Sequence, residues 1–430
     1  MVNVKVSIPY GSTHLTVSFP DNISVKLLIP RDVPGLRDPR VRIREALKKP
    51  IGSKPLSEII SSRDIRKAVI IISDLTRPVP DNIILPEILR ELNSSGIGKD
   101  KITIVVATGA HTPPSFEEIK NRIGEEVVRN VSKIEIHNAK DKSNLIYIGE
   151  TSFGNKIYIN KTVFEADLKI ATGCIRPHII AGYSGGRKII LPGVAGEETI
   201  SYNHFKFLTH PKVRPGEIEE NPISKDMEEA AKLAGLDFIV NVILNTENEV
   251  YRVVAGDPYI AWREGVRIAD KIYRVSLESP VDILIVSPGE YPEDINLYQS
   301  LSKAVNPLWY VVKDGGVVIL VAECRDGVGD SLMEEWLVKA SSPEEVVERG
   351  LREGLKLGPH VGWFTCYRVL SRARFIVVSS IERHKIEQML FTYASNMDEA
   401  LKLALKYVKG KPEIAIVPYA SKTVINVKGH

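Results

Sequence analysis

The chain has 430 residues, of which 43% are hydrophobic and 26% charged, as in ordinary globular proteins. A net charge of +3 gives no general attraction to nucleic acid or to an anionic membrane. No apolar run reaches the about 20 residues of a membrane-spanning helix. The few, widely separated cysteines argue against a disulfide framework and a zinc knuckle, and predict a reducing, cytoplasmic location. They are Cys174, Cys324 and Cys366.

Short apolar runs and helical patterns alternate along most of the chain. Residues 1–20 alternate in polarity around Tyr10-Gly11-Ser12, which predicts two strands rather than a signal peptide. Later runs rich in Ile and Val predict an α/β protein with largely parallel sheets covered on both faces. The expected strands are 68–74, 101–109, 166–173, 281–289, 315–323 and 373–380, with helices over 85–96 and 116–124.

A domain boundary is expected in the stretch 255–280, which reads as a long helix before a new strand. We therefore predict an N-terminal α/β domain over 1–275 and a C-terminal α/β domain over 276–430.

Polar side chains follow three predicted strands, where ligands bind in open α/β sheets. Asp74, Thr76 and Arg77 follow the first strand, and His111 follows the second. Asp74 and Thr76 could cap a helix or contact a ligand. Arg77 offers a planar fork for a carboxylate or phosphate, against the alternative of an ordinary surface arginine. His111 could transfer protons near neutral pH or simply be hydrogen-bonded in its loop.

The third strand leads into the segment 175–193, IRPHIIAGYSGGRKIILPG, which concentrates glycine, an imidazole and two cations. His178 could pair with His111 across one small substrate, removing and restoring a proton on either face. The phosphate-loop pattern fails because it requires Gly at Arg187 and Ser or Thr at Ile189. Lys188 could be an exposed cation, a phosphate contact or a nucleophile. Arg187 has no role assigned from sequence.

Two weaker signals come later in the chain. His204 on a helix is usually a surface or core residue, but it could be the single protein ligand of a metal held mainly by a cofactor. In the C-terminal domain, Tyr298 and Gln299 could hydrogen-bond a carboxylate or hydroxyl, and Lys303 could add charge. The alternative is the start of an amphipathic helix with Tyr298 packed.

Taken together, these motifs resemble the nickel-dependent lactate racemase family. The resemblance covers nearly the whole chain and is densest from 73 to 204. Any one motif is weak, but their combination in this order is specific. They are SDLTRPVP (73–80), ATGAHTP (107–113), ATGCIRPHIIAGYSGGRKIILPGVAG (171–196), NH (203–204) and DINLYQ (294–299).

The resemblance implies a racemase or epimerase of a 2-hydroxy acid that transfers hydride to and from a nickel-pincer nucleotide, with coupled proton transfer. His111 and His178 would be the acid/base pair, and His204 would bind nickel. Lys188 would attach the cofactor. The N-terminal domain would carry the cofactor and acid/base motifs, the C-terminal domain would add substrate contacts, and the active site would lie in the cleft between the two domains. Further cofactor contacts would come from Asp74, Thr76, Gly185 and Gly186, and substrate contacts from Arg77, Tyr298, Gln299 and Lys303.

One departure puts lactate itself in doubt. Members that process lactate usually carry a lysine three residues after the LYQ glutamine, where this chain has Ser302 and the lysine follows at Lys303. One residue is a rotation of about 100° on a helix. Another 2-hydroxy acid or a sugar acid fits equally well. The alternatives are a nucleotide- or pyridoxal phosphate-dependent enzyme with Lys188 as Schiff base, and a non-catalytic cofactor-binding protein.

Overall fold

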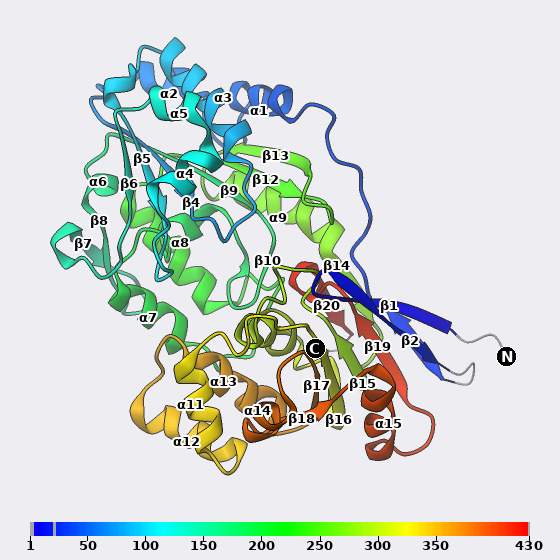
Figure 1. Cartoon of the computed structure of the whole chain (residues 1–430). Helices are drawn as coiled ribbons and strands as arrows, with labels where there is room; N and C mark the ends of the chain where they lie inside the picture. The colour runs from blue at the N-terminus through cyan, green and yellow to red at the C-terminus, as the bar shows by residue number, and fades with distance from the viewer. Residues whose placement is uncertain (1–3, 20–22, 429–430) are drawn as a thin grey trace. The chain divides into compact units, whose positions relative to one another are not determined.

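A computed structural model describes residues 4–19 and 23–428, which form two compact units. One unit comprises residues 32–272. The other combines residues 1–31 with residues 273–430. Figure 1 shows the elements of each unit, coloured along the chain. Among the described helices, none is long and apolar enough to cross a membrane.

The unit 32–272 is built on a six-stranded sheet in the order β13-β12-β9-β4-β5-β6. All neighbouring pairs are parallel except β12 and β13. The central strands are apolar and almost wholly buried, as expected for a parallel sheet covered on both faces. The strands are β4 (Ala68–Ser73), β5 (Ile102–Ala107), β6 (Lys133–Ile136), β9 (Leu168–Cys174), β12 (Phe238–Leu244) and β13 (Val250–Gly256).

Five helices bury their apolar side chains in one core with this sheet. They are α1 (Pro39–Lys48), α2 (Leu56–Ser61), α3 (Asp81–Ser94), α4 (Phe116–Ile123) and α5 (Glu125–Arg129). The remaining elements include α6 (Lys161–Phe164), α7 (Glu197–Lys206), α8 (Pro222–Ala234) and α9 (Ile260–Tyr273). Two short hairpins complete the unit: β7 (Leu145–Glu150) with β8 (Lys156–Asn160), and β10 (Pro177–His178) with β11 (Gly182–Tyr183).

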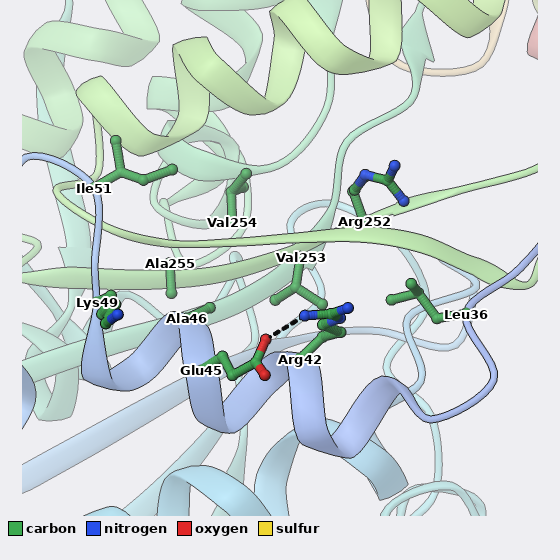
Figure 2. A pocket seen from close by; sticks show the side chains of 10 residues that line it. All are labelled: Leu36, Arg42, Glu45, Ala46, Lys49, Ile51, Arg252, Val253, Val254 and Ala255. Atoms are coloured by element: carbon green, nitrogen blue, oxygen red, sulfur yellow. Dashed lines mark hydrogen bonds and ion pairs between the residues drawn. The ribbon is translucent and has the colours of Figure 1, made fainter.

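A hollow of about 510 Å³ lies between α1 and the edge strand β13 (Figure 2). Its wall is mostly apolar, and the guanidinium of Arg42 pairs with the Glu45 carboxylate at 2.6 Å across its rim. None of the candidate site residues lines it. This hollow is therefore separate from the site predicted from the sequence.

The second unit contains a fully parallel sheet in the order β18-β17-β16-β15-β19-β3. Its strands are β3 (Ser24–Leu27), β15 (Val281–Val286), β16 (Val312–Val321), β17 (Arg374–Val378), β18 (Thr392–Ala394) and β19 (Glu413–Val417). Strands β14 (Arg274–Leu277) and β20 (Val424–Val427) pair separately. The helices are α10 (Leu297–Ser300), α11 (Ser331–Lys339), α12 (Pro343–Glu353), α13 (Pro359–Thr365), α14 (Arg383–Gln388) and α15 (Met397–Tyr407).

The predicted α/β class with largely parallel sheets is confirmed, and each expected strand from residue 68 on is present. The predicted N-terminal strand pair is the antiparallel hairpin β1 (Val4–Tyr10) and β2 (Thr13–Phe19), with residues 1–3 and 20 outside the described residues. The helix expected within 255–280 ends at Tyr273, because β14 begins at Arg274.

The predicted division into 1–275 and 276–430 needs one correction. The boundary lies at 272/273, close to the expectation, but residues 1–31 belong to the unit that holds the C-terminal part of the chain. Strand β3 pairs with β19, and hairpin residues such as Ile8 and Phe19 share a core with β15 and β16. The sequence could not predict this assignment, because pairing between segments so far apart in the chain leaves no local sequence pattern.

Phe19→Ala should therefore destabilise the unit that contains residues 273–430. Phe19 is fully buried in that core, and removing a buried aromatic ring costs about 3–5 kcal/mol. Denaturant unfolding measures the loss. Leu351→Ala, at a side chain that is 72% exposed, is the control and should change stability by less than about 0.5 kcal/mol. Equal effects of the two substitutions would contradict this packing.

Candidate functional site

The three strands expected to deliver the site are adjacent in the sheet, in the order β9-β4-β5. From β4 the chain builds outward through β5 and β6, and then returns to the other side of β4 to form β9, β12 and β13. Such a reversal of strand order is where open α/β sheets bind ligands. The strands that lead to His111 and His178, β5 and β9, are not neighbours, because β4 lies between them.

Buried Asp74, which follows β4, pairs with the more exposed His111, which follows β5. The Asp74 carboxylate is 4% exposed and lies 2.6 Å from Nδ1 of His111. Thr76 donates to the same carboxylate from its hydroxyl, at 2.6 Å, and from its backbone N–H. Burial alone would raise the pKa of Asp74, but the hydrogen bonds from His111 and Thr76 lower it below its usual value.

This pairing fixes the tautomer of His111. An ionised carboxylate only accepts hydrogen bonds, so Nδ1 of His111 carries a proton and neutral His111 has its lone pair on Nε2. The helix-capping alternative for Asp74 and Thr76 is wrong, because α3 begins only at Asp81. Asp74 instead orients an imidazole that can accept a proton, and Thr76 orients Asp74.

Arg77 brings a positive charge to the same place. Its guanidinium makes no ion pair with a carboxylate in the described part of the chain. Its charge lowers the pKa of Asp74, of Lys188 and of His178, so these groups lie around one small region. A partly exposed guanidinium without an internal carboxylate is available to a carboxylate ligand.

Arg122 on α4 holds the loop after β4 in place, a role that sequence reasoning missed. Its guanidinium donates to the carbonyl oxygens of Ser73, Asp74 and Val79. It also pairs with the buried Asp81 carboxylate at 2.7 Å, which in turn accepts from the hydroxyl of Thr172 at 2.7 Å. The loop that carries Asp74 is thereby tied to both α4 and β9.

His178 is held in the opposite tautomer to His111. Its Nδ1 accepts hydrogen bonds from the backbone N–H groups of Ala181 at 3.2 Å and Ile180 at 3.4 Å, so the proton of neutral His178 is on Nε2. Burial, followed by the positive charges of Lys188 and Arg77, holds its pKa well below the usual value. His178 is therefore neutral near pH 7, with an N–H at Nε2.

Lys188 lies in the 3-10 turn Gly186–Ile189 and is only partly exposed. Its ammonium has no hydrogen-bonding or ionic partner among residues 4–19 and 23–428. Burial, with the charges of Arg77 and Arg187, holds its pKa well below the usual value. A lysine whose amine is neutral near pH 7 is a nucleophile. This environment favours the nucleophile reading of Lys188 over the exposed-cation reading.

The two glycines before Lys188 are explained by packing. Gly185 has φ of 77°, and a Cβ there would lie 2.6 Å from Oδ1 of Asn241. Gly186 has φ of 52°, and a Cβ there would lie 2.7 Å from the Trp262 ring. Direct contacts of these glycines with a cofactor stay a prediction, since their own neighbours already exclude a side chain.

His204 lies on α7, as predicted, and its charge lowers the pKa of His178. The described residues contain no group of three or more His, Cys, Asp or Glu side chains that could hold a metal. The imidazole of His204 is the one predicted protein ligand, and a single protein ligand suits a metal that arrives with ligands of its own.

The residues predicted from DINLYQ lie in the other unit, on and after α10. Tyr298 packs edge-on against His360, with 6.1 Å between ring centroids, and burial raises the pKa of Tyr298 to about 12. Asn296 accepts the backbone N–H of Gln299 and so caps α10. The packed-helix alternative thus describes Tyr298 well, and its contact with substrate stays a prediction.

The surroundings of Lys303 differ from the expectation of an available cation. Lys303 lies in the π-helical turn Leu301–Val305, and its ammonium pairs with the Glu293 carboxylate at 2.9 Å. Both side chains are partly buried. The neighbouring carboxylate offsets the charge that was predicted to bind substrate.

Several functional neighbours escaped the sequence reasoning. Arg122 lies on α4, outside the motifs, and had no signal of its own. Asp81 directly follows the SDLTRPVP motif, and Thr172 lies inside ATG, so position beside a motif was their only signal.

Comparison with known proteins gives consistent family matches. The lactate racemase N-terminal domain matches residues 10–216 and the lactate racemase C-terminal domain matches residues 277–425. The chain is 35% identical to a lactate racemase of Thermoanaerobacterium thermosaccharolyticum, over 99% of this chain and 100% of that protein. The chain belongs to the lactate racemase family. Its members include a lactate racemase of Lactiplantibacillus plantarum, 34% identical over 96% of this chain and 98% of that one.

Solved structures agree with this family. The lactate racemase apoprotein of T. thermosaccharolyticum superposes with a TM-score of 0.91 at 33% identity, covering 98% of this chain and 100% of that one. A Thermotoga maritima protein with a TM-score of 0.65 and 19% identity shares the fold. As a member of the lactate racemase family, the chain is an isomerase with racemase activity. This family membership argues against the two alternatives, a pyridoxal phosphate-dependent enzyme and a non-catalytic cofactor-binding protein.

Arg122→Met should destabilise the protein by about 3 kcal/mol or more. It leaves the buried Asp81 carboxylate without its ionic partner, and breaking a buried pair from one side is strongly unfavourable. Urea unfolding measures the loss. Arg122→Met combined with Asp81→Asn should recover part of it. Arg129→Met, at a side chain that is 75% exposed, is the control and should be nearly neutral. A neutral Arg122→Met would contradict the assigned role.

Proposed function

We propose that the chain interconverts the two enantiomers of a 2-hydroxy acid at the carboxyl ends of β9, β4 and β5. The observation that carries this proposal is the pair of imidazoles, with a lone pair at Nε2 of His111 and a proton at Nε2 of His178. The two strands that lead to these imidazoles, β5 and β9, flank β4. Interconversion requires both acceptance and donation of a proton at the substrate oxygen.

The positively charged Arg77 provides the orienting contact. Its guanidinium can bind the substrate carboxylate through two parallel hydrogen bonds, which fixes the position of C2 and its hydroxyl. His111 then takes the hydroxyl proton through Nε2, and the Asp74 carboxylate stabilises the imidazolium that forms. His178 donates a hydrogen bond from Nε2 to the same oxygen, and the imidazolium of His111 returns the proton when the hydroxyl re-forms.

The residues present fit the nickel-pincer nucleotide that the family resemblance implies. Lys188, whose pKa is held well below the usual value, would hold the cofactor, and the imidazole of His204 would ligate nickel. Arg77 lies close enough to Lys188 to favour an anionic group beside it. When bound, the cofactor would accept a hydride from C2 and return it.

The substrate class is a 2-hydroxy acid rather than lactate alone. Position 302, where related lactate enzymes carry a lysine, holds a buried, uncharged serine. The neighbouring Lys303 is paired with Glu293, so its charge is already offset. Arg77 is left as the carboxylate contact that the geometry supports. Tyr298 and Gln299 remain predicted substrate contacts.

His111→Ala and His178→Ala should each abolish interconversion in both directions, by a factor of at least about 100. Chiral chromatography of single-enantiomer 2-hydroxy acids, with cofactor-loaded enzyme, measures the rates. His384→Ala, at a side chain that is 63% exposed, is the control and should leave the rate unchanged. Long-range ¹⁵N NMR of the imidazoles should show Nδ1–H for His111 and Nε2–H for His178. A variant of either histidine with wild-type rates would remove the assignment.

Arg77→Met should raise KM for the carboxylate substrate by about 10- to 100-fold, since it removes a charge-assisted contact worth about 1.5–3 kcal/mol. Lys303→Met should change KM by less than about threefold, because Lys303 is already paired with Glu293. Initial rates over a range of substrate concentrations distinguish the two. A larger effect from Lys303→Met than from Arg77→Met would reverse the assigned carboxylate contact.

A further inference from the structure

Arg187 is a buried arginine that neither the sequence nor the proposed reaction explains. It is 2% exposed, and its guanidinium donates to the carbonyl oxygens of Ala181 at 2.9 Å and Tyr183 at 3.3 Å. A third hydrogen bond, of 2.7 Å, reaches the hydroxyl of Ser224 on α8. These bonds join helix α8 to the chain between His178 and Lys188.

Trp262 on α9 packs against the guanidinium of Arg187. The guanidinium carbon of Arg187 lies 3.6 Å from the centroid of the Trp262 ring, within the range of a cation–π contact. The indole N–H donates to the carbonyl oxygen of Ser184 at 2.9 Å, and the ring contacts Gly186 closely enough to exclude a Cβ there. The Arg187 guanidinium and the Trp262 indole thus donate hydrogen bonds to the backbone carbonyl oxygens of residues 181, 183 and 184.

The charge of Arg187 is only weakly compensated. No carboxylate in the described ranges forms an ion pair with it. Burial lowers its pKa to about 9; the Glu228 carboxylate on α8 opposes this, and the Arg263 guanidinium on α9 adds to it. Toward the site, Arg187 and Arg77 are the charges that disfavour the ammonium form of Lys188, and Lys188 in turn acts on His178.

We propose that Arg187 is a positioning residue that fixes His178 and Lys188 relative to one another. Its three hydrogen bonds fasten the segment whose two ends carry these side chains. Its charge also acts on the adjacent lysine. The proposal rests on the proposed function only in giving Lys188 the task of cofactor attachment.

The test measures the reactivity of Lys188 before cofactor is loaded. Competitive acetylation by acetic anhydride across pH 6–11, read by mass spectrometry of the Lys188 peptide, gives the pKa of its amine. Wild type should titrate well below the usual lysine pKa of about 10.4. In Arg187→Met the pKa should rise, because one of the two charges that lower it is removed, and labelling of Lys188 at pH values below its pKa should fall. Arg187→Lys keeps the charge and should hold the pKa close to that of wild type.

Two further variants separate positioning from folding. Ser224→Ala removes one of the three hydrogen bonds, and Trp262→Phe removes the bond to Ser184 while keeping an aromatic ring. Both should remain folded, keep the pKa of Lys188 near that of wild type, and lower kcat of the loaded enzyme more than they raise KM. Arg267→Met on α9, at an exposed side chain, is the control and should change none of these readouts.

A folded Arg187→Met, Ser224→Ala or Trp262→Phe protein with the Lys188 titration and kcat of wild type would overturn the proposal. If Arg187→Met does not fold, a wild-type kcat in both milder variants overturns it in the same way. A wild-type holoenzyme with unmodified Lys188 would contradict cofactor attachment at that residue. The acetylation result would still decide the role of Arg187.

Discussion

Basic side chains crowded into a partly buried region are the constraint on which this site depends. Arg77 and Lys188 have no carboxylate partner within the described residues, and Arg187 has none within ion-pair distance. Such crowding costs stability and favours loss of a proton by the groups that can lose one. The pKa values of Lys188 and His178 are accordingly held well below their usual values, while Arg77 is left for a ligand.

The Asp74 carboxylate is the counterpart of this cationic region. It pairs with His111 and leaves Arg77, which neighbours it in the same loop, without a direct ion pair. The loop itself is held by Arg122, whose guanidinium binds three backbone oxygens and the Asp81 carboxylate. Two arginines outside the predicted site, Arg122 and Arg187, thus support the two segments that carry the predicted chemistry.

The two histidines share a residue type but differ in their partners. A carboxylate faces Nδ1 of His111, and backbone N–H groups face Nδ1 of His178. The ring nitrogen left for a ligand is Nε2 in both, with a lone pair in one and a proton in the other. A reaction that takes a proton from a hydroxyl oxygen and returns it can use both states. The Asp74 carboxylate supplies the first and the backbone beside His178 supplies the second.

The sequence by itself determined the α/β class, the buried strands and most of the candidate residues. Apolar runs such as 68–74 and 101–109 predict buried parallel strands, and the motif residues follow these runs directly. Only the tertiary structure decided which strands are neighbours, that residues 1–31 join the C-terminal unit, and that Lys303 is paired with Glu293. It also gave roles to Arg187 and Arg122. The physical reason is that strand periodicity and turn chemistry act locally, whereas partners of a buried charge come from elements distant in sequence.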